Sequence, residues 1–236
     1  MTAALLLTGG PDHAHDFDAS GSALADVIAA AGFDVVIEHD PDRAAAKLTQ
    51  GFRVLVVNAL RWRMFGDRYD PWRPEWGYTT PESTRRSLAA FVAEGGGLVG
   101  VHTASICFDD WPEWGDILGG AWEWGVSSHP PVGAVSARVA EGSTGHDVLG
   151  VAPVALSLND EVYGDMSMRP GVQVLMVAKR TPTDDDQPVV WAHRYGSGRV
   201  VYDGFGHDAE SIRNDAHAAL LQRAVQWVSE EEHATG

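Results

Sequence analysis

The first part of the chain alternates short apolar runs with helical patterns. Ala3–Leu7 and Val54–Val57 are almost continuously apolar, which is typical of strands buried on both faces of a parallel sheet. Between them, an alanine-rich segment that Ser20 or Ser22 can cap, and that Gly32 closes, predicts the first helix. The other elements predicted in this part are strands at Phe33–Ile37 and Leu98–Val101, a helix at Pro41–Leu48, and a helix that begins at Pro81 and ends at Gly95. Such alternation predicts parallel strands joined by right-handed crossovers.

The pattern changes in two later segments. Residues 58–80 are rich in Trp and Arg and have neither helical nor alternating periodicity, which predicts a long functional or covering loop. After about residue 120, strands separated by turn signals replace the alternation and predict an antiparallel extension of the sheet. These strands are predicted at Val132–Val139, Val172–Ala178, Pro188–Tyr195 and Arg199–Asp203. An amphipathic helix from near Ser211 to Ser229 completes the pattern.

Length and composition agree with one large domain. A chain of 236 residues with 44% hydrophobic and 21% charged residues has the composition of a globular protein with a substantial core. Neither an internal repeat nor a linker-like segment divides the sequence. We therefore expect residues 1–236 to form a single α/β domain.

The charge balance narrows the classes of partner. The chain has 33 acidic and 17 basic residues, so its formal charge of -16 disfavours binding to nucleic acid or to an anionic membrane. No apolar stretch is long enough to span a bilayer, and the N-terminal segment lacks the basic region of a signal peptide. Cys107 is the only cysteine, which fits a reducing compartment. We expect a cytoplasmic protein with a small-molecule partner, and a homo-oligomer is compatible with these features.

Histidines follow several predicted strands. His13 and His15 come after the first strand, His102 directly after the fourth, and His207 after the last. Ligands of open parallel sheets bind beyond the carboxyl ends of the strands, so these side chains are expected at one edge. Imidazole is suited both to proton transfer near neutral pH and to binding zinc-like ions, which predicts a site centred on His102. The histidines in predicted exposed or terminal positions are interpreted as surface residues: His39, His217 and His233.

His102 occupies a sharp turn after a short buried strand. A turn of this kind presents a nucleophile in related architectures, but histidine is a better base or metal ligand than a lasting nucleophile. Cys107 lies five residues further on beside Phe108 and is interpreted as a buried structural thiol. A hydrolase that uses Cys107 or Ser105 as its nucleophile is the weakest hypothesis, because neither residue lies at the turn.

Short polar motifs occur along nearly the whole chain. They are His15-Asp16, the Gly-Gly-Gly-Leu-Val-Gly-Val-His run that ends at His102, Ser128-His129-Pro130, Gly145-His146-Asp147, Asp160-Glu161-Val162-Tyr163, the run from Pro188 to His193, and Gly198 to Tyr202 leading to Gly206-His207-Asp208-Ala209-Glu210-Ser211. In this order and at these spacings, the chain resembles the ThuA-like (trehalose utilisation) family within the class I glutamine amidotransferase-like superfamily. The resemblance implies a flavodoxin-like three-layer α/β/α sandwich, with a mostly parallel sheet and an antiparallel C-terminal extension.

The resemblance also implies which residues form the site. The polar positions shared with the family match His15, His102, Glu161 and His207. Glutamine amidotransferases of this superfamily place a cysteine in the tight turn, whereas the turn residue here is His102, so glutaminase activity is not expected. Family members are associated with sugar metabolism. His146 departs from the family pattern, because Asp147 replaces the more usual proline after it, and it is assigned a structural role.

Two mechanisms remain open for these residues. His15, His102, His207 and Glu161 could hold a divalent zinc-like ion, with Asp16 or Glu210 orienting a ligand imidazole from outside. Alternatively, His102, His207 and Glu161 could act without a metal as general acid and base. Substrate contacts are assigned to residues of the motifs and to two tryptophans that follow predicted strand ends: Asp16, Trp62, Trp111, His129, Tyr163 and Glu210.

Two classes of function remain. The leading hypothesis is an enzyme that acts on a small sugar or keto-sugar by hydrolysis or isomerisation, either with a metal or by acid and base catalysis. The alternative is a non-catalytic sugar-binding or interaction module on an amidotransferase-like scaffold.

Overall fold

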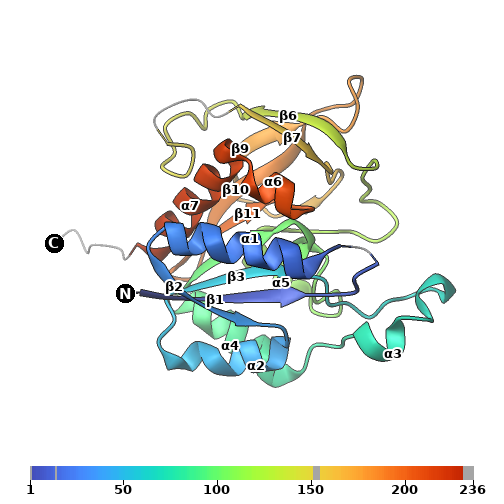
Figure 1. The fold of residues 1–236 in the computed structure, drawn as a ribbon, viewed down its shortest axis with the longest axis vertical. Helices are drawn as coiled ribbons and strands as arrows, with labels where there is room; N and C mark the ends of the chain where they lie inside the picture. Colours follow the sequence, from blue (N-terminus) through green and yellow to red (C-terminus); the bar gives the residue numbers. More distant parts are fainter. Residues whose placement is uncertain (1, 14, 151–154, 231–236) are drawn as a thin grey trace.

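A nine-stranded sheet runs through the protein, and five neighbouring strands of it are parallel (Figure 1). The computed structural model describes residues 2–13, 15–150 and 155–230. In spatial order the parallel strands are β2 (Phe33–Glu38), β1 (Thr2–Gly9), β3 (Val54–Ala59), β4 (Gly97–Val101) and β11 (Gly198–Asp203). This is the 2-1-3-4-5 order of a flavodoxin-like sheet, with β11 in the fifth place. The flavodoxin-like prediction is confirmed.

Four antiparallel strands extend the sheet beyond β11. They are β10 (Gln187–Tyr195), β9 (Gln173–Ala178), β6 (Gly133–Val139) and β7 (Leu156–Asp160). β7 is not predicted from the sequence, because its two inward leucines alternate with polar residues over only five positions. A small two-stranded sheet, β5 (Gly120–Ala121) with β8 (Ser167–Met168), was also not predicted.

Helices cover both faces of the parallel half and complete a three-layer sandwich (Figure 1). On one face lie α1 (Phe17–Ala30) and α7 (Asp215–Ser229), which pack Ile28 and Leu221 into the same core cluster as Val56 of β3. On the other face lie α2 (Pro41–Lys47), α4 (Glu82–Ala93) and α5 (Pro112–Leu118). Their Leu88 and Leu118 pack with Leu55 of β3. Because β3 is buried from both sides, its sequence is continuously apolar.

Several helix boundaries differ from the predicted ones. α1 begins at Phe17, since the side chain of Asp16, and not that of Ser20 or Ser22, accepts a hydrogen bond from the Ala19 amide. Pro81 is the N-cap of α4 and not its first helical residue. The final predicted helix is two helices, α6 (Ala209–Arg213) and α7, because Asn214 leaves the helical conformation and caps the second one.

The Trp-rich segment at 58–80 is not entirely irregular. It contains two one-turn helices, η2 (Asp67–Tyr69) and α3 (Arg73–Trp76), and further one-turn helices occur at η1 (Leu48–Gln50) and η3 (His102–Ser105). The segment projects from the sandwich in Figure 1. Among the helices that the structure describes, none combines the length and apolar character required to cross a membrane.

Candidate functional site

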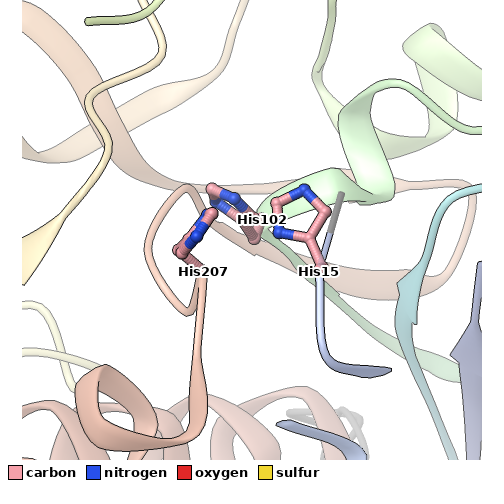
Figure 2. Close-up of side chains that lie close together, drawn as sticks. All are labelled: His15, His102 and His207. Atoms are coloured by element: carbon pink, nitrogen blue, oxygen red, sulfur yellow. The ribbon is translucent and has the colours of Figure 1, made fainter. Parts of the chain in front are cut away.

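Three histidines from separate segments meet beyond the carboxyl ends of the parallel strands (Figure 2). His15 lies between β1 and α1, His102 begins η3 after β4, and His207 follows β11. One ring nitrogen of each histidine lies within 4.8 Å of one ring nitrogen of each of the others. The loop that carries His207 passes close to β4 because Gly206, at φ 102°, has no side chain: a Cβ there would lie 2.9 Å from Val101 Cγ1.

His102 has a strained backbone and a fixed ring. Its φ of 47° lies in the left-handed region, which non-glycine residues seldom adopt outside functional turns. The ring is buried, and its Nδ1 lies 2.8 Å from the carbonyl oxygen of Gly204. A carbonyl can only accept, so Nδ1 carries the proton and Nε2 presents its lone pair in the neutral ring. The Tyr163 hydroxyl, 3.1 Å away, donates to this Nε2.

Glu161 is the carboxylate of the cluster. Its Oε2 lies 3.5 Å from His102 Nε2 and 3.5 Å from His207 Nδ1, and its Oε1 lies 3.2 Å from His129 Nδ1. Glu161 directly follows β7, the outermost strand of the sheet, but the chain after it folds back across the strand ends. Gly164 there forms a β-bridge with Ser128, which places His129 beside the carboxylate.

Burial and mutual charge set the protonation of these groups. Burial, followed by the charges of His102 and His207, lowers the pKa of His15 to about 3. Burial alone would raise the pKa of Glu161, but the neighbouring imidazoles of His102, His129 and His207 hold it well below its usual value. Glu161 in turn raises the pKa of His129 and of His207. At neutral pH the cluster therefore contains a neutral His15 and an ionised Glu161.

A buried polar network beneath the cluster fixes Glu161 and the His207 loop relative to each other. Asp160 Oδ1 accepts from the Glu161 amide at 2.7 Å, and its Oδ2 accepts from the Gly206 amide at 2.8 Å and from the Ser211 hydroxyl. His217 lies 3.0 Å from Asp203 Oδ2 and 2.9 Å from the Ser211 carbonyl oxygen. The interpretation of His217 as a surface residue is wrong: its side chain is fully buried. His39 is exposed as expected, and His233 lies outside the described residues.

The contacts of His217 require an imidazolium. Both ring nitrogens face acceptors, so both must donate, and only the protonated ring can do this. Burial alone would lower the pKa of His217, but the charge of Asp203 and the hydrogen bonds to Asp203 and Ser211 outweigh burial and raise it. A raised folded-state pKa adds stability that is complete below the unfolded pKa and is lost as the pH rises through the folded one.

We predict that His217→Gln lowers the free energy of unfolding by about 1.5–3 kcal/mol at pH 6, because one charged hydrogen bond is lost. The difference between variant and wild type should be smaller at pH 9 than at pH 6, because the added stability is lost as the pH rises through the folded-state pKa. Urea unfolding at both pH values measures this. A variant that is equally destabilised at pH 6 and pH 9 would show that His217 is neutral in the folded protein.

A cavity of about 290 Å³ opens above the cluster. His15, Glu161, Tyr163 and His207 line it, whereas His102 lies buried beside them and does not line it. Its other lining residues come from the N-terminal loop, the Trp-rich segment, the turn after η3 and the segment before β6: His13, Leu60, Trp62, Arg68, Tyr69, Ile106, Trp122, Trp124 and His129.

Three residues predicted to contact substrate do not line the cavity. Trp111 is buried in the core among Phe108 and Trp114, because the chain after η3 turns back onto the sheet. Asp16 is exposed and caps α1, and Glu210 is exposed on α6. Trp62, His129 and Tyr163 do line it.

The remaining sequence candidates lie outside the cavity. Cys107 is buried, and its Sγ lies 2.8 Å from the Ala59 carbonyl oxygen. Burial raises the pKa of the thiol to about 12, so it is not a nucleophile at neutral pH. Ser105 is also buried and hydrogen-bonds to Tyr202. His146 packs against Trp227 of α7.

Some residues of the site were not identified from the sequence. Asp160 was named only as part of the motif that contains Glu161. The available signal in the sequence was its position next to a predicted ligand. Trp122 and Trp124 were included only in the general group of tryptophans. Nothing in the sequence singled out Arg68 and Tyr69 within the predicted loop at 58–80, because the path of this Trp-rich segment depends on tertiary packing.

The flavodoxin-like sheet and the strand-end histidines define an α/β protein with a polar site at the edge of a parallel sheet. A family model described as trehalose utilisation (ThuA) matches residues 3–228, so the chain belongs to the ThuA family. Membership of this family implies a role in trehalose utilisation. A comparison with curated proteins found no match.

Solved structures with the same fold have low sequence identity to this chain. A ThuA-like protein from Parabacteroides merdae has a TM-score of 0.75 and 20% identity, with 97% of this chain and 90% of that chain covered. One from Bacteroides uniformis has a TM-score of 0.68 and 21% identity, with 96% and 91% covered. The β-galactosidase of Rahnella sp. R3 has a TM-score of 0.63 and 15% identity, and 98% of this chain matches 32% of that chain. At these identities the similarity concerns the fold.

Proposed function

We propose that this ThuA-family protein is a metal-dependent enzyme that acts on a small sugar or keto-sugar by hydrolysis or isomerisation. In this proposal His15, His102 and His207 bind a divalent zinc-like ion, and Glu161 moves protons or completes the ligand set. The observation that supports it most directly is the convergence of three imidazoles on one point, with one nitrogen of each within 4.8 Å of the others.

The donor set fits a metal of this type. Nδ1 of His15 and Nδ1 of His207 are buried and have no hydrogen-bond partner among the described residues. His15 is neutral, and the Gly204 carbonyl holds the His102 ring so that Nε2 is free of its proton. Fixing of a ring by a backbone carbonyl on its other nitrogen is the usual arrangement of metal-binding histidines.

A bound zinc-like ion would supply Lewis-acid polarisation to a sugar carbonyl or to water. The other steps belong to residues of the chain. Glu161 is ionised and lines the cavity, so it can accept a proton from a substrate carbon or hydroxyl. Burial raises the pKa of Tyr163 well above its ordinary value, so its hydroxyl stays protonated. If His102 Nε2 binds a metal, this hydroxyl can donate to a substrate oxygen instead.

The cavity itself suits a carbohydrate. Trp62, Trp122 and Trp124 contribute aromatic rings, which pack against the C–H faces of sugars, while the polar groups at the inner end can bind hydroxyls. A volume of about 290 Å³ fits a ligand of one or two sugar rings with part of it exposed. Trehalose utilisation, the description of the family, agrees with this class of ligand.

The proposal is tested by assaying hydrolysis and isomerisation of keto-glycosides before chelation, after chelation and after reloading with zinc. We expect turnover to disappear with the metal and to return with it. Turnover that survives complete metal removal would indicate that Glu161 and His207 catalyse the reaction as acid and base without a metal. A protein that binds sugars but turns none over, with or without metal, would be a sugar-binding module.

A further inference from the structure

Two tryptophans that line the cavity have indole donors without acceptors among the described residues. Trp62 is 3% exposed, and its indole Nε1 has no hydrogen-bond partner among the described residues. Trp122, which directly follows β5, also has a buried Nε1 without a partner in the part of the chain that the structure describes. An indole N–H can only donate, and an unpaired buried donor is unfavourable, so both groups favour a ligand that brings oxygen acceptors.

Arg68 adds a positive charge to the lining of the cavity. It lies in η2, is exposed, and stacks on Tyr69 with its Cζ 4.6 Å from the ring centre. Its Nη2 atom donates a hydrogen bond to the Tyr69 hydroxyl at 2.5 Å. No carboxylate of the described residues forms an ion pair with this guanidinium, whereas Arg63, Arg73 and Arg85 of the neighbouring segments each have one.

Acidic side chains are scarce in the cavity, although the protein as a whole is strongly acidic. The whole chain has a formal charge of -16, yet Glu161 is the single acidic residue among the described residues that line the cavity. That carboxylate already contacts His102, His129 and His207. An anionic ligand would therefore meet Arg68 and the two indole donors without facing an unpaired carboxylate.

From these observations we infer that the cavity selects a sugar that carries a negative charge, as a carboxylate or a phosphate, beside Arg68. Arg68 binds the anionic group, and Trp62 and Trp122 donate to oxygens of the same ligand. This inference rests on the proposed function, because it assigns a substrate class to the same site. Guanidinium groups bind carboxylates and phosphates through paired donors, so Arg68 suits both.

The test is calorimetric titration of the purified protein with matched sugars. D-Glucose, D-glucuronate and D-glucose 6-phosphate share one ring and differ at one carbon, and trehalose with trehalose 6-phosphate forms a disaccharide pair. We expect at least one anionic sugar to bind about tenfold more tightly than its neutral counterpart, as one charged hydrogen-bonding pair provides. Whether glucuronate or the phosphates show the preference distinguishes a carboxylate from a phosphate ligand.

Arg68→Gln should abolish this preference. Arg86→Gln is the matched control, since Arg86 is an exposed arginine on α4 that does not line this cavity. The control should keep the full preference although the net charge changes equally. Equal binding of neutral and anionic sugars, or a preference that persists in Arg68→Gln, overturns the inference and leaves the proposed function intact. If none of the five sugars binds, carbohydrate recognition fails, and the proposed function fails with it.

Discussion

Replacing His102 with alanine should lower turnover of a keto-sugar by about 10³-fold or more and remove detectable metal binding. The side chain provides one of three imidazoles in the cluster, and its ring is held by Gly204 and Tyr163. Loss of a residue that merely orients a ligand costs about 10–100-fold in metal affinity, and loss of the ligand itself costs more. Steady-state kinetics and zinc titration of the metal-stripped variant measure the two effects.

The control for this variant is His146→Ala. His146 is a half-buried histidine that packs on Trp227 and lies outside the cavity, so its removal should change neither turnover nor metal affinity. Because His102 is buried, its variant requires a check of the fold by circular dichroism. His207→Ala, whose side chain is 21% exposed, provides the same test with less disturbance of the core. Full activity in folded His102→Ala and His207→Ala proteins would refute the site.

Glu161→Gln should lower turnover by about 10²–10⁴-fold, the range that a general base contributes. Glutamine keeps the shape of the side chain but cannot accept a proton, so the fold and the cavity should be retained. Three histidines now face this carboxylate within 3.5 Å. Kinetics at saturating substrate separate the loss of turnover from any change in affinity.

A second measurement distinguishes the charge of Glu161 from its shape. Because Glu161 raises the pKa of His129, the pKa of His129 should fall in the metal-free Glu161→Gln variant when followed by NMR. Glu210→Gln is the matched control, since this exposed acid on α6 does not line the cavity. It should leave both turnover and the pKa of His129 unchanged. Glu161→Gln with wild-type turnover would remove Glu161 from the catalytic residues.

Much of the fold could be predicted from local pattern. Strands β1, β3 and β4 are apolar because both faces are covered, and glycines end the helices between them, so alternation alone indicated a parallel sheet. The carboxyl ends of those strands then placed His15, His102 and His207 at one edge, and the structure brings them together. The family resemblance supplied Glu161, which local pattern could not have placed.

The remaining features depend on contacts that are distant in sequence. β7 lies at the far edge of the sheet. Glu161 is held at the cluster because the preceding residue, Asp160, accepts hydrogen bonds from Gly206 and Ser211. His217 resembled a surface histidine, since its partner Asp203 is 14 residues away in the sequence, at the end of β11. Trp111 lies a few residues after a strand end, where a cavity residue is also expected. The chain nevertheless folds it into the core.

The most direct test of the histidine site is the metal content of the purified protein, measured by plasma mass spectrometry after incubation with zinc and removal of excess ion. We predict one ion per chain in the wild type and in His146→Ala, and none in His15→Ala, His102→Ala or His207→Ala. A wild-type protein that holds no ion under these conditions, or cluster variants that retain as much as the wild type, would contradict this prediction.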